Sequence, residues 1–193
     1  MNHIESIEKS LKDKLSLNEI VRKVYLTYPT SALVDKEEKQ YEILNEISQH
    51  FTIPINHIQV CGSSKVGQSF HKVSTFTPKI SDLDIAIIDP NLFLKYSELV
   101  FSITKGFQDI TKFTSSKGKS FESYTLYISK GIFRPDFMPT CPERVNWFKF
   151  FHTLSLKHND YFKSINAGIY NSQLFFEYKQ STNIKEFISS KKI

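Results

Sequence analysis

Cysteine and glycine are both scarce in this 193-residue chain, and each scarcity excludes a class of protein. The two cysteines, Cys61 and Cys141, are too few for a disulfide framework or a cysteine-ligated zinc site. Six Gly and seven Pro are too few for a fibrous repeat or a low-complexity disordered chain. We therefore expect a folded protein whose two thiols are reduced, as thiols are in the cytoplasm.

The sequence also lacks a signal-peptide pattern at its start and any apolar run of membrane length. These absences predict a cytoplasmic protein with no membrane partner. A strong charge of one sign is absent as well, because the formal net charge is only +5. Such a mild excess of positive charge favours an anionic ligand without identifying one.

Aromatic residues, in contrast, are abundant, with seventeen Phe and nine Tyr in a chain that is 40% hydrophobic. A chain of this length and composition can bury the core of one domain. We expect a helical N-terminal segment (1–51), a central core (52–140) and a helical C-terminal segment (141–193) that completes the same domain.

Hydrophobic periodicity predicts an α+β fold, in which helices precede and follow an interrupted sheet. Residues 68–80 show little periodicity and are predicted to form a loop, in which His71 and Lys79 are expected at the surface. The predicted helices cover residues 1–51 with a break near Pro29, residues 90–104, and the chain from Pro142 onward. The predicted strands cover residues 58–60, 82–88, 123–129 and 131–138.

Two acidic residues mark the clearest of these strands. Asp82 and Asp84 are two positions apart, so their side chains lie on one face, while Leu83, Ile85 and Ile87 lie on the other. Two carboxylates on one exposed face suit a hard divalent cation, typically Mg²⁺ that carries a nucleotide phosphate. The Gly62-Ser63 turn upstream is of a size to hold that phosphate. Together they predict metal-assisted phosphoryl chemistry.

A third carboxylate, Asp136, lies in the short run Arg134-Pro135-Asp136. On a strand beside Asp82 and Asp84 it would complete a site for two Mg²⁺ or Mn²⁺ ions, and Asp136 would also serve as a base for the attacking hydroxyl. The alternative is an exposed aspartate at the end of a strand.

A Gly-Ser turn, an Asp-x-Asp strand and a later Asp-x-x-Pro run, in that order, resemble the DNA polymerase β-type nucleotidyltransferases. The likeness spans residues 58–139 and is strongest to small bacterial members of the oligoadenylate-synthase and cyclic-oligonucleotide branch. It implies a polymerase β-like core, which is a short mixed β-sheet with flanking helices. It also implies two Mg²⁺ or Mn²⁺ ions, ATP or another nucleoside triphosphate (NTP) or deoxynucleoside triphosphate as substrate, and release of pyrophosphate. The long connection, residues 64–81, departs from many minimal members and suggests a lid or a different acceptor.

The resemblance assigns roles to further residues. Gly62 and Ser63 would bind phosphate, and Lys65 and Arg134 would meet the triphosphate, with a solvated surface charge as the equal alternative for both. The acceptor stays open. The alternatives are template-independent oligonucleotide synthesis in bacterial anti-phage defence with an operon-encoded effector, a toxin–antitoxin-type transferase acting on protein or RNA, and a non-catalytic nucleotide-binding module. Tyr170 or Tyr178 is a candidate self-primer.

Overall fold

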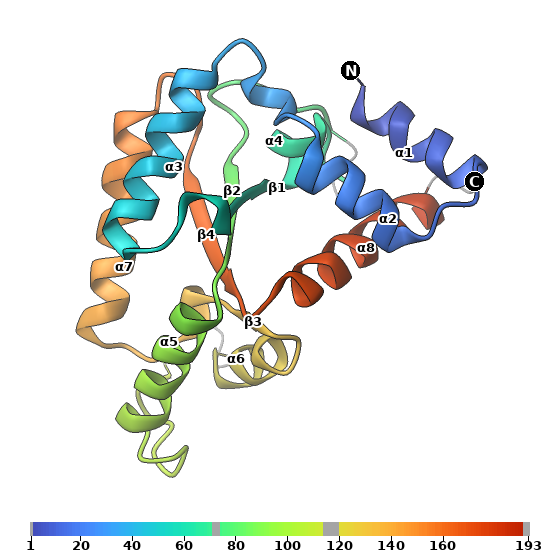
Figure 1. Ribbon diagram of the computed structural model, residues 1–193. Coiled ribbons are helices and arrows are strands. Elements are labelled where there is room, and N and C mark those ends of the chain that lie inside the picture. Colours follow the sequence, from blue (N-terminus) through green and yellow to red (C-terminus); the bar gives the residue numbers. More distant parts are fainter. Residues whose placement is uncertain (1, 71–73, 114–119, 191–193) are drawn as a thin grey trace.

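A four-stranded sheet lies at the centre of the computed structural model, with helices on both of its faces (Figure 1). The structure describes residues 2–70, 74–113 and 120–190. The strand order is β1-β2-β4-β3, with β2 and β4 parallel and the two outer strands antiparallel to their neighbours. The fold is thus α+β with a small mixed sheet, which confirms the predicted class. The strands are β1 (Ile58–Cys61), β2 (Leu83–Ile88), β3 (Ile132–Phe133) and β4 (Ile165–Tyr170).

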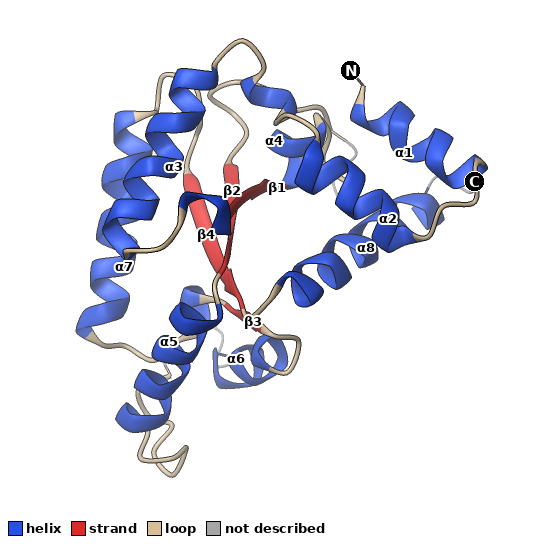
Figure 2. Cartoon of the chain, viewed as in Figure 1, coloured by secondary structure: helices blue, strands red, loops and turns tan. Residues whose placement is uncertain are grey.

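Helices make up most of the rest of the described chain (Figure 2). None of the helices in the described ranges is long and apolar enough to cross a membrane. The α-helices are α1 (His3–Lys12), α2 (Leu17–Val21), α3 (Glu37–Phe51), α4 (Gly62–Val66), α5 (Pro90–Ile103), α6 (Ser120–Ile128), α7 (Pro142–Lys157) and α8 (Gln173–Ser190). A π-helical turn η1 (Arg22–Thr27) and the 3₁₀ turns η2 (Ser31–Leu33), η3 (Ile55–His57) and η4 (Pro135–Phe137) complete the set.

The alternation along β2 divides the protein into two hydrophobic clusters, one on each face of the sheet. Leu83, Ile85 and Ile87 lie in the first cluster, as the sequence predicts, while Ala86 lies in the second. The sheet is therefore the middle of three layers. In Figure 1, α3 and α7 lie on one side of it, and α1, α2 and α8 lie on the other.

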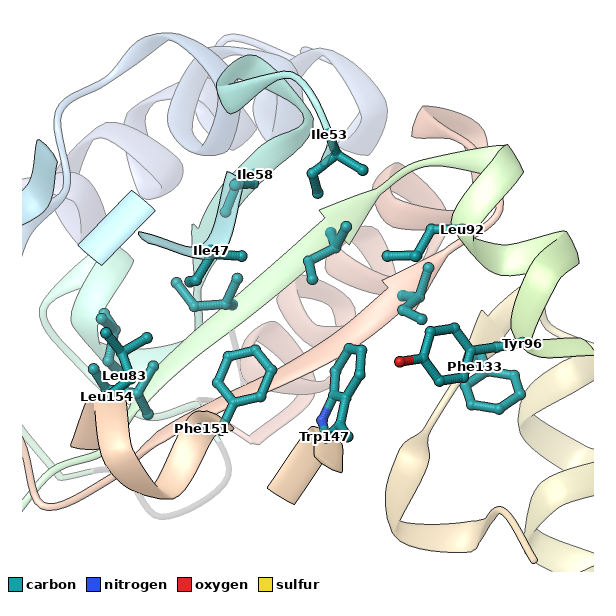
Figure 3. Close-up of a cluster of buried hydrophobic side chains, with 14 of the residues drawn as sticks. Ile47, Ile53, Ile58, Leu83, Leu92, Tyr96, Phe133, Trp147, Phe151 and Leu154 are labelled. Atoms are coloured by element: carbon teal, nitrogen blue, oxygen red, sulfur yellow. The ribbon is translucent and has the colours of Figure 1, made fainter. Parts of the chain in front are cut away.

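The first cluster combines aliphatic side chains with aromatic rings, among them Tyr96, Phe133, Trp147 and Phe151 (Figure 3). Trp147 and Phe151 of α7 pack together with ring centroids 5.0 Å apart, and Tyr96 of α5 meets Trp147 edge to face at 5.5 Å. Aromatic pairs in such geometries contribute about 0.5–1.5 kcal/mol each beyond the burial of their surface. This packing fixes α7 and α5 against the sheet, and it accounts for part of the unusual aromatic content.

The second cluster joins the N-terminal helices to α8. Tyr25 of η1 and Phe176 of α8 are both buried and meet edge to face at 6.1 Å. Beside them Arg22 donates a 2.8 Å hydrogen bond to Glu177, whose side chain is only 2% exposed. The two ends of the chain thus form one helical layer over the second face.

Several sequence predictions are confirmed. The helical N-terminal segment breaks where Pro29 predicts, because η1 ends at Thr27 and Tyr28 is extended. Asp89 caps α5 by accepting a 2.7 Å hydrogen bond from the Leu92 amide, and Pro90 occupies the first helical position.

The predicted strand at residues 123–129 is wrong, since this segment forms α6. Tyr, Thr and Ile in this segment favour a strand by intrinsic propensity. Helical winding instead brings Tyr124 into the first cluster, where its ring lies 5.4 Å from Phe113 and 5.9 Å from Phe133. Burial of one helical face therefore outweighs the local preference.

The predicted strand at residues 131–138 is shorter than expected. Only Ile132 and Phe133 pair with β4, and the chain then turns through η4. Pro135 has no amide hydrogen, so it cannot extend the ladder. Asp136 consequently lies on a 3₁₀ turn, and the prediction that it lies on a strand beside Asp82 and Asp84 is wrong.

The strand beside Asp84 comes from the C-terminal segment, for which only helices were predicted. Residues 165–170 form β4, which lies between β2 and β3. Ile165 and Ile169 join the first cluster and Tyr170 joins the second, so the segment has the period of two that strands require. The segment 141–193 thus supplies a central strand as well as helices.

Candidate functional site

Three strands bring three polar or nucleophilic residues into one row across the sheet. Asp84 of β2 lies opposite Cys61 of β1 on one side and opposite Asn166 of β4 on the other. Asp84 and Ala86 share the second face, so this face is apolar at Ala86 and polar two residues earlier. The carboxylate therefore lies at the exposed end of an otherwise buried strand.

Gly62 packs directly against the Asp84 carboxylate. Its φ of +66° is in the left-handed region, and a Cβ placed on it would lie 2.4 Å from Asp84 Oδ2. Any side chain at this position would have to displace the carboxylate. The Gly-Ser turn and the Asp-x-Asp strand, 22 positions apart in the sequence, are thus in contact at this one point.

Asp82 is fixed by a chain of hydrogen bonds that leads back to β4. The Asn166 side-chain amide donates to Ser164 Oγ at 2.9 Å, and Ser164 Oγ donates to Asp82 Oδ1 at 2.8 Å. Ser64 Oγ of α4 donates to the Asp82 backbone carbonyl, also at 2.8 Å. These bonds orient Asp82 just ahead of β2.

Asp136 and Arg134 form an ion pair on the η4 side of the sheet. The Arg134 guanidinium donates to Asp136 Oδ2 at 2.8 Å, and both side chains are partly exposed. Arg134 Cδ would lie 3.4 Å from a Cβ placed on Gly168, so its stem crosses β4 where that strand has no side chain. Arg144 of α7 holds the turn by donating to the backbone carbonyl of Asp136 at 3.1 Å.

Asp84 lines two cavities, each of about 420 Å³. One we call the aromatic cavity, and it also contains Asp84, Arg134, Asp136, Asn166 and Lys179. Its aromatic lining consists of Tyr127, Trp147, Phe148, Phe151 and Tyr170. The other we call the hydroxyl cavity, and it also contains Asp82, Asp84 and Lys163. Its hydroxyl-bearing lining consists of Tyr25, Ser63, Ser69, Ser74, Thr75, Thr77 and Ser81.

Among the described residues, three line both cavities, namely Gly62, Asp84 and Asn183. Asn183 of α8 donates from Nδ2 to Gln180 Oε1 at 3.1 Å. Its Oδ1 is buried and has no hydrogen-bond partner among the described residues. A buried acceptor without a donor is costly, so such a group in a native protein calls for an explanation.

The connection between turn and strand lines the hydroxyl cavity. Gln68, Ser69, Ser74, Thr75 and Thr77 come from the predicted loop at residues 68–80. Its described part carries one isolated bridge, Gln68 to Thr75. His71 lies outside the described residues.

Lys65 is not among the described residues that line either cavity. It is buried, its ammonium donates a 2.7 Å hydrogen bond to the Tyr28 carbonyl, and burial lowers the pKa of Lys65 to about 8. The alternative of a solvated surface charge is therefore wrong for Lys65, whereas the triphosphate contact stays a prediction. Lys65 ties α4 to the N-terminal helices.

The two candidate self-primers, Tyr170 and Tyr178, differ in burial and in their position relative to the cavities. Tyr170 lines the aromatic cavity, and burial raises the pKa of its hydroxyl well above the usual range. Tyr178 of α8 is 68% exposed and is not among the described residues that line either cavity. Cys61 lies beside Asp84, where burial and then the neighbouring carboxylate raise the pKa of its thiol, so the thiol stays protonated.

The donor set around Asp82 and Asp84 fits a magnesium ion that a substrate brings with it. Within the described residues, no three His, Cys, Asp or Glu side chains gather closely enough to form a metal cage. Mg²⁺ is usually bound through one or two carboxylates, several waters and substrate phosphates, so two carboxylates beside an open cavity meet its needs.

Sequence reasoning missed Ser164, Asn166 and Asn183. The first two follow from β4, whose alternating pattern was available in the sequence. Asn183 carries no such signal, because its position depends on how α8 packs. Comparison of this chain with family models, curated proteins and solved structures finds no match.

Proposed function

We propose that this protein is a metal-dependent nucleotidyltransferase, which moves a nucleoside monophosphate from a nucleoside triphosphate to a hydroxyl acceptor. One observation carries the proposal: Gly62 of the phosphate-sized turn packs against Asp84, and both line the cavity that Asp82 also lines. The resemblance to polymerase β-type nucleotidyltransferases requires this contact between segments far apart in sequence. The polymerase β-like core itself remains part of the proposal.

Asp82 and Asp84 would hold the metal ions, which supply charge stabilisation at the transferring phosphate. The Ser164 bond to Asp82 and the Gly62 contact with Asp84 set the two carboxylates before substrate arrives. Such preorganisation avoids reorganisation cost at the moment of reaction. Ser63 lines the hydroxyl cavity and offers a donor to a phosphate oxygen.

The reaction forms a bond between the acceptor oxygen and the α-phosphorus and breaks the bond from that phosphorus to the bridging oxygen. The electron pair leaves with pyrophosphate, and the acceptor's proton needs a base. Asp136 lines the same cavity as Asp84 from the η4 side, and we assign it this role. Arg134 positions the Asp136 carboxylate through their ion pair.

The test compares Asp84→Asn with Asp13→Asn, which changes an exposed aspartate after α1. Each protein is incubated with labelled nucleoside triphosphates and Mg²⁺, and products are separated into free oligomer, modified protein and modified RNA. We expect transfer to fall by at least about a thousandfold in Asp84→Asn and to be unchanged in the control. Equal transfer in both variants would refute the proposal.

The same product analysis separates the acceptor alternatives. Free oligomers would favour template-independent synthesis, whereas labelled protein or RNA would favour the toxin–antitoxin-type reaction. Bound nucleotide without any transfer would favour the non-catalytic module. The role in anti-phage defence and the operon-encoded effector stay predictions from the resemblance.

A further inference from the structure

We infer that the aromatic cavity is the acceptor site and that its acceptor is a single-stranded nucleic acid with a free terminal hydroxyl. The inference rests on the proposed function and names the substrate class of the same site. It starts from the arrangement of the two cavities around Asp84 and Gly62, which both cavities share.

Phosphoryl transfer places the attacking and leaving oxygens on opposite sides of the phosphorus. If the α-phosphate lies at Asp84, pyrophosphate leaves into one cavity and the acceptor attacks from the other. The hydroxyl cavity has the chemistry for pyrophosphate, because it combines Ser63 and other hydroxyl donors with the cation of Lys163. The aromatic cavity is then left for the acceptor.

The aromatic cavity has the chemistry of a base-binding site. Phe148 of α7 is 40% exposed and lines this cavity, and the guanidinium of Arg144 lies 5.5 Å from the centre of its ring. Aromatic rings combined with cations are the means by which proteins bind single-stranded nucleic acid without reading its sequence.

Charge also favours an anionic acceptor. Asp136 is paired with Arg134, so the two charges compensate each other. The remaining charged residues of the described lining are Asp84, which the proposed function gives to a divalent cation, and Lys179 of α8. With a cation at Asp84 the cavity is positive, which suits a phosphate backbone and disfavours a polycationic acceptor.

Asn183 would bind the sugar of the terminal nucleotide. Asn183 lines both cavities, and its buried Oδ1 has no donor among the described residues. A sugar hydroxyl supplies such a donor. Gln180 fixes the amide by accepting from Nδ2.

The experiment measures binding first, without chemistry. A dye-labelled single-stranded oligoribonucleotide with a free 3′ hydroxyl is titrated with protein and followed by fluorescence anisotropy. We expect Phe148→Ala to weaken binding by about tenfold, as loss of one base–aromatic stack does. Leu156→Ala, an exposed residue at the far end of the same helix, should change nothing.

Lys179→Ala should weaken binding and reduce the slope of log affinity against log salt by about 0.7, the effect of one lost phosphate contact. Lys185→Ala on the same helix is the control, since Lys185 is exposed and not among the described lining residues. Unchanged affinity and slope in Phe148→Ala and Lys179→Ala would overturn the inference.

A second measurement follows extension of the same oligoribonucleotide with NTPs. We expect Phe148→Ala to raise the KM for the oligonucleotide about tenfold and to leave the KM for the NTP unchanged. A raised KM for the NTP alone would mean that the cavity holds the donor base, and exclusive labelling of a protein would mean a protein acceptor. Either result overturns the inference while Asp84-dependent transfer stands. Oligonucleotide binding that depends on Phe148, without any transfer, would instead refute the proposed function alone.

Discussion

Replacing Gly62 with alanine should have two effects: strain in the left-handed backbone at this position and displacement of the Asp84 carboxylate. An ordinary contact begins at 3.4 Å, so the 2.4 Å approach of a new Cβ would force Asp84 Oδ2 back by about 1 Å. The left-handed backbone adds about 1–2 kcal/mol of strain, because alanine lacks the freedom of glycine at this φ. For a chain of this length, that strain lowers the melting temperature by about 2–8 °C.

The transfer rate of Gly62→Ala should fall much further than its loss of stability explains. A displacement of about 1 Å at a reacting centre can cost about a hundredfold in rate, so we expect Gly62→Ala to lose at least that much transfer of label from NTP. The measurement pairs initial rates at saturating Mg²⁺ with thermal unfolding of the same preparation, so that loss of folded protein is subtracted.

Gly106→Ala is the matched control for this experiment. Gly106 has a φ of +69°, close to the +66° of Gly62, and its added Cβ would meet only the Phe101 ring at 3.3 Å. It should therefore lose a similar amount of stability and keep its activity. If the rates of the two variants fell equally, backbone strain alone would explain the lower rate of Gly62→Ala. The proposal that the Gly62-Ser63 turn and the two aspartates form one site would then fail.

Other parts of the molecule give three further predictions. Burial acts to raise the pKa of Glu177, but hydrogen bonds from Arg22 and Gln173 outweigh it and hold the pKa below its usual value. Arg22→Ala should therefore lower the unfolding free energy at neutral pH, and in urea titrations this difference should shrink as the pH falls through the lowered pKa of Glu177. Burial lowers the pKa of Lys65 to about 8, so between about pH 8 and 10.5 the unfolded chain binds more protons than the folded protein. The unfolding free energy of the unmodified protein, measured relative to that of Lys65→Met, should therefore rise over this range. Phe162→Ala, at a fully buried ring, should cost about 3–5 kcal/mol by the same urea titration, and a loss below 1 kcal/mol would contradict the packing.

The strongest local patterns in the sequence were sufficient to predict the elements that carry them. The alternation from Leu83 to Ile88 and the capped start of α5 at Asp89 both depend on neighbouring residues, so they could be recognised without tertiary information. The same holds for the close spacing of Asp82 and Asp84, which share one strand face.

Two of the failures, the strand predicted at residues 123–129 and the missed Asn183, depend on contacts between distant residues. The segment at residues 120–128 winds as a helix because Tyr124 reaches rings supplied by Phe113 and Phe133, which local propensity does not record. Asp136 was placed on a strand because η4 could not be distinguished from a strand end. Asn183 could not be recognised from the sequence, because its position in the lining of both cavities follows from the packing of α8.

The central position of β4 has a consequence for how the protein is made. Strand β2 ends at Ile88, but the strand that pairs with its inner edge is complete only at Tyr170, 82 residues later. At typical rates of synthesis the edge of β2 waits roughly 4 to 16 seconds for its partner. During that interval a nascent chain exposes unpaired backbone groups beside Ile85 and Ile87, which favours aggregation. A chaperone that holds the emerging chain should therefore raise the yield of folded protein.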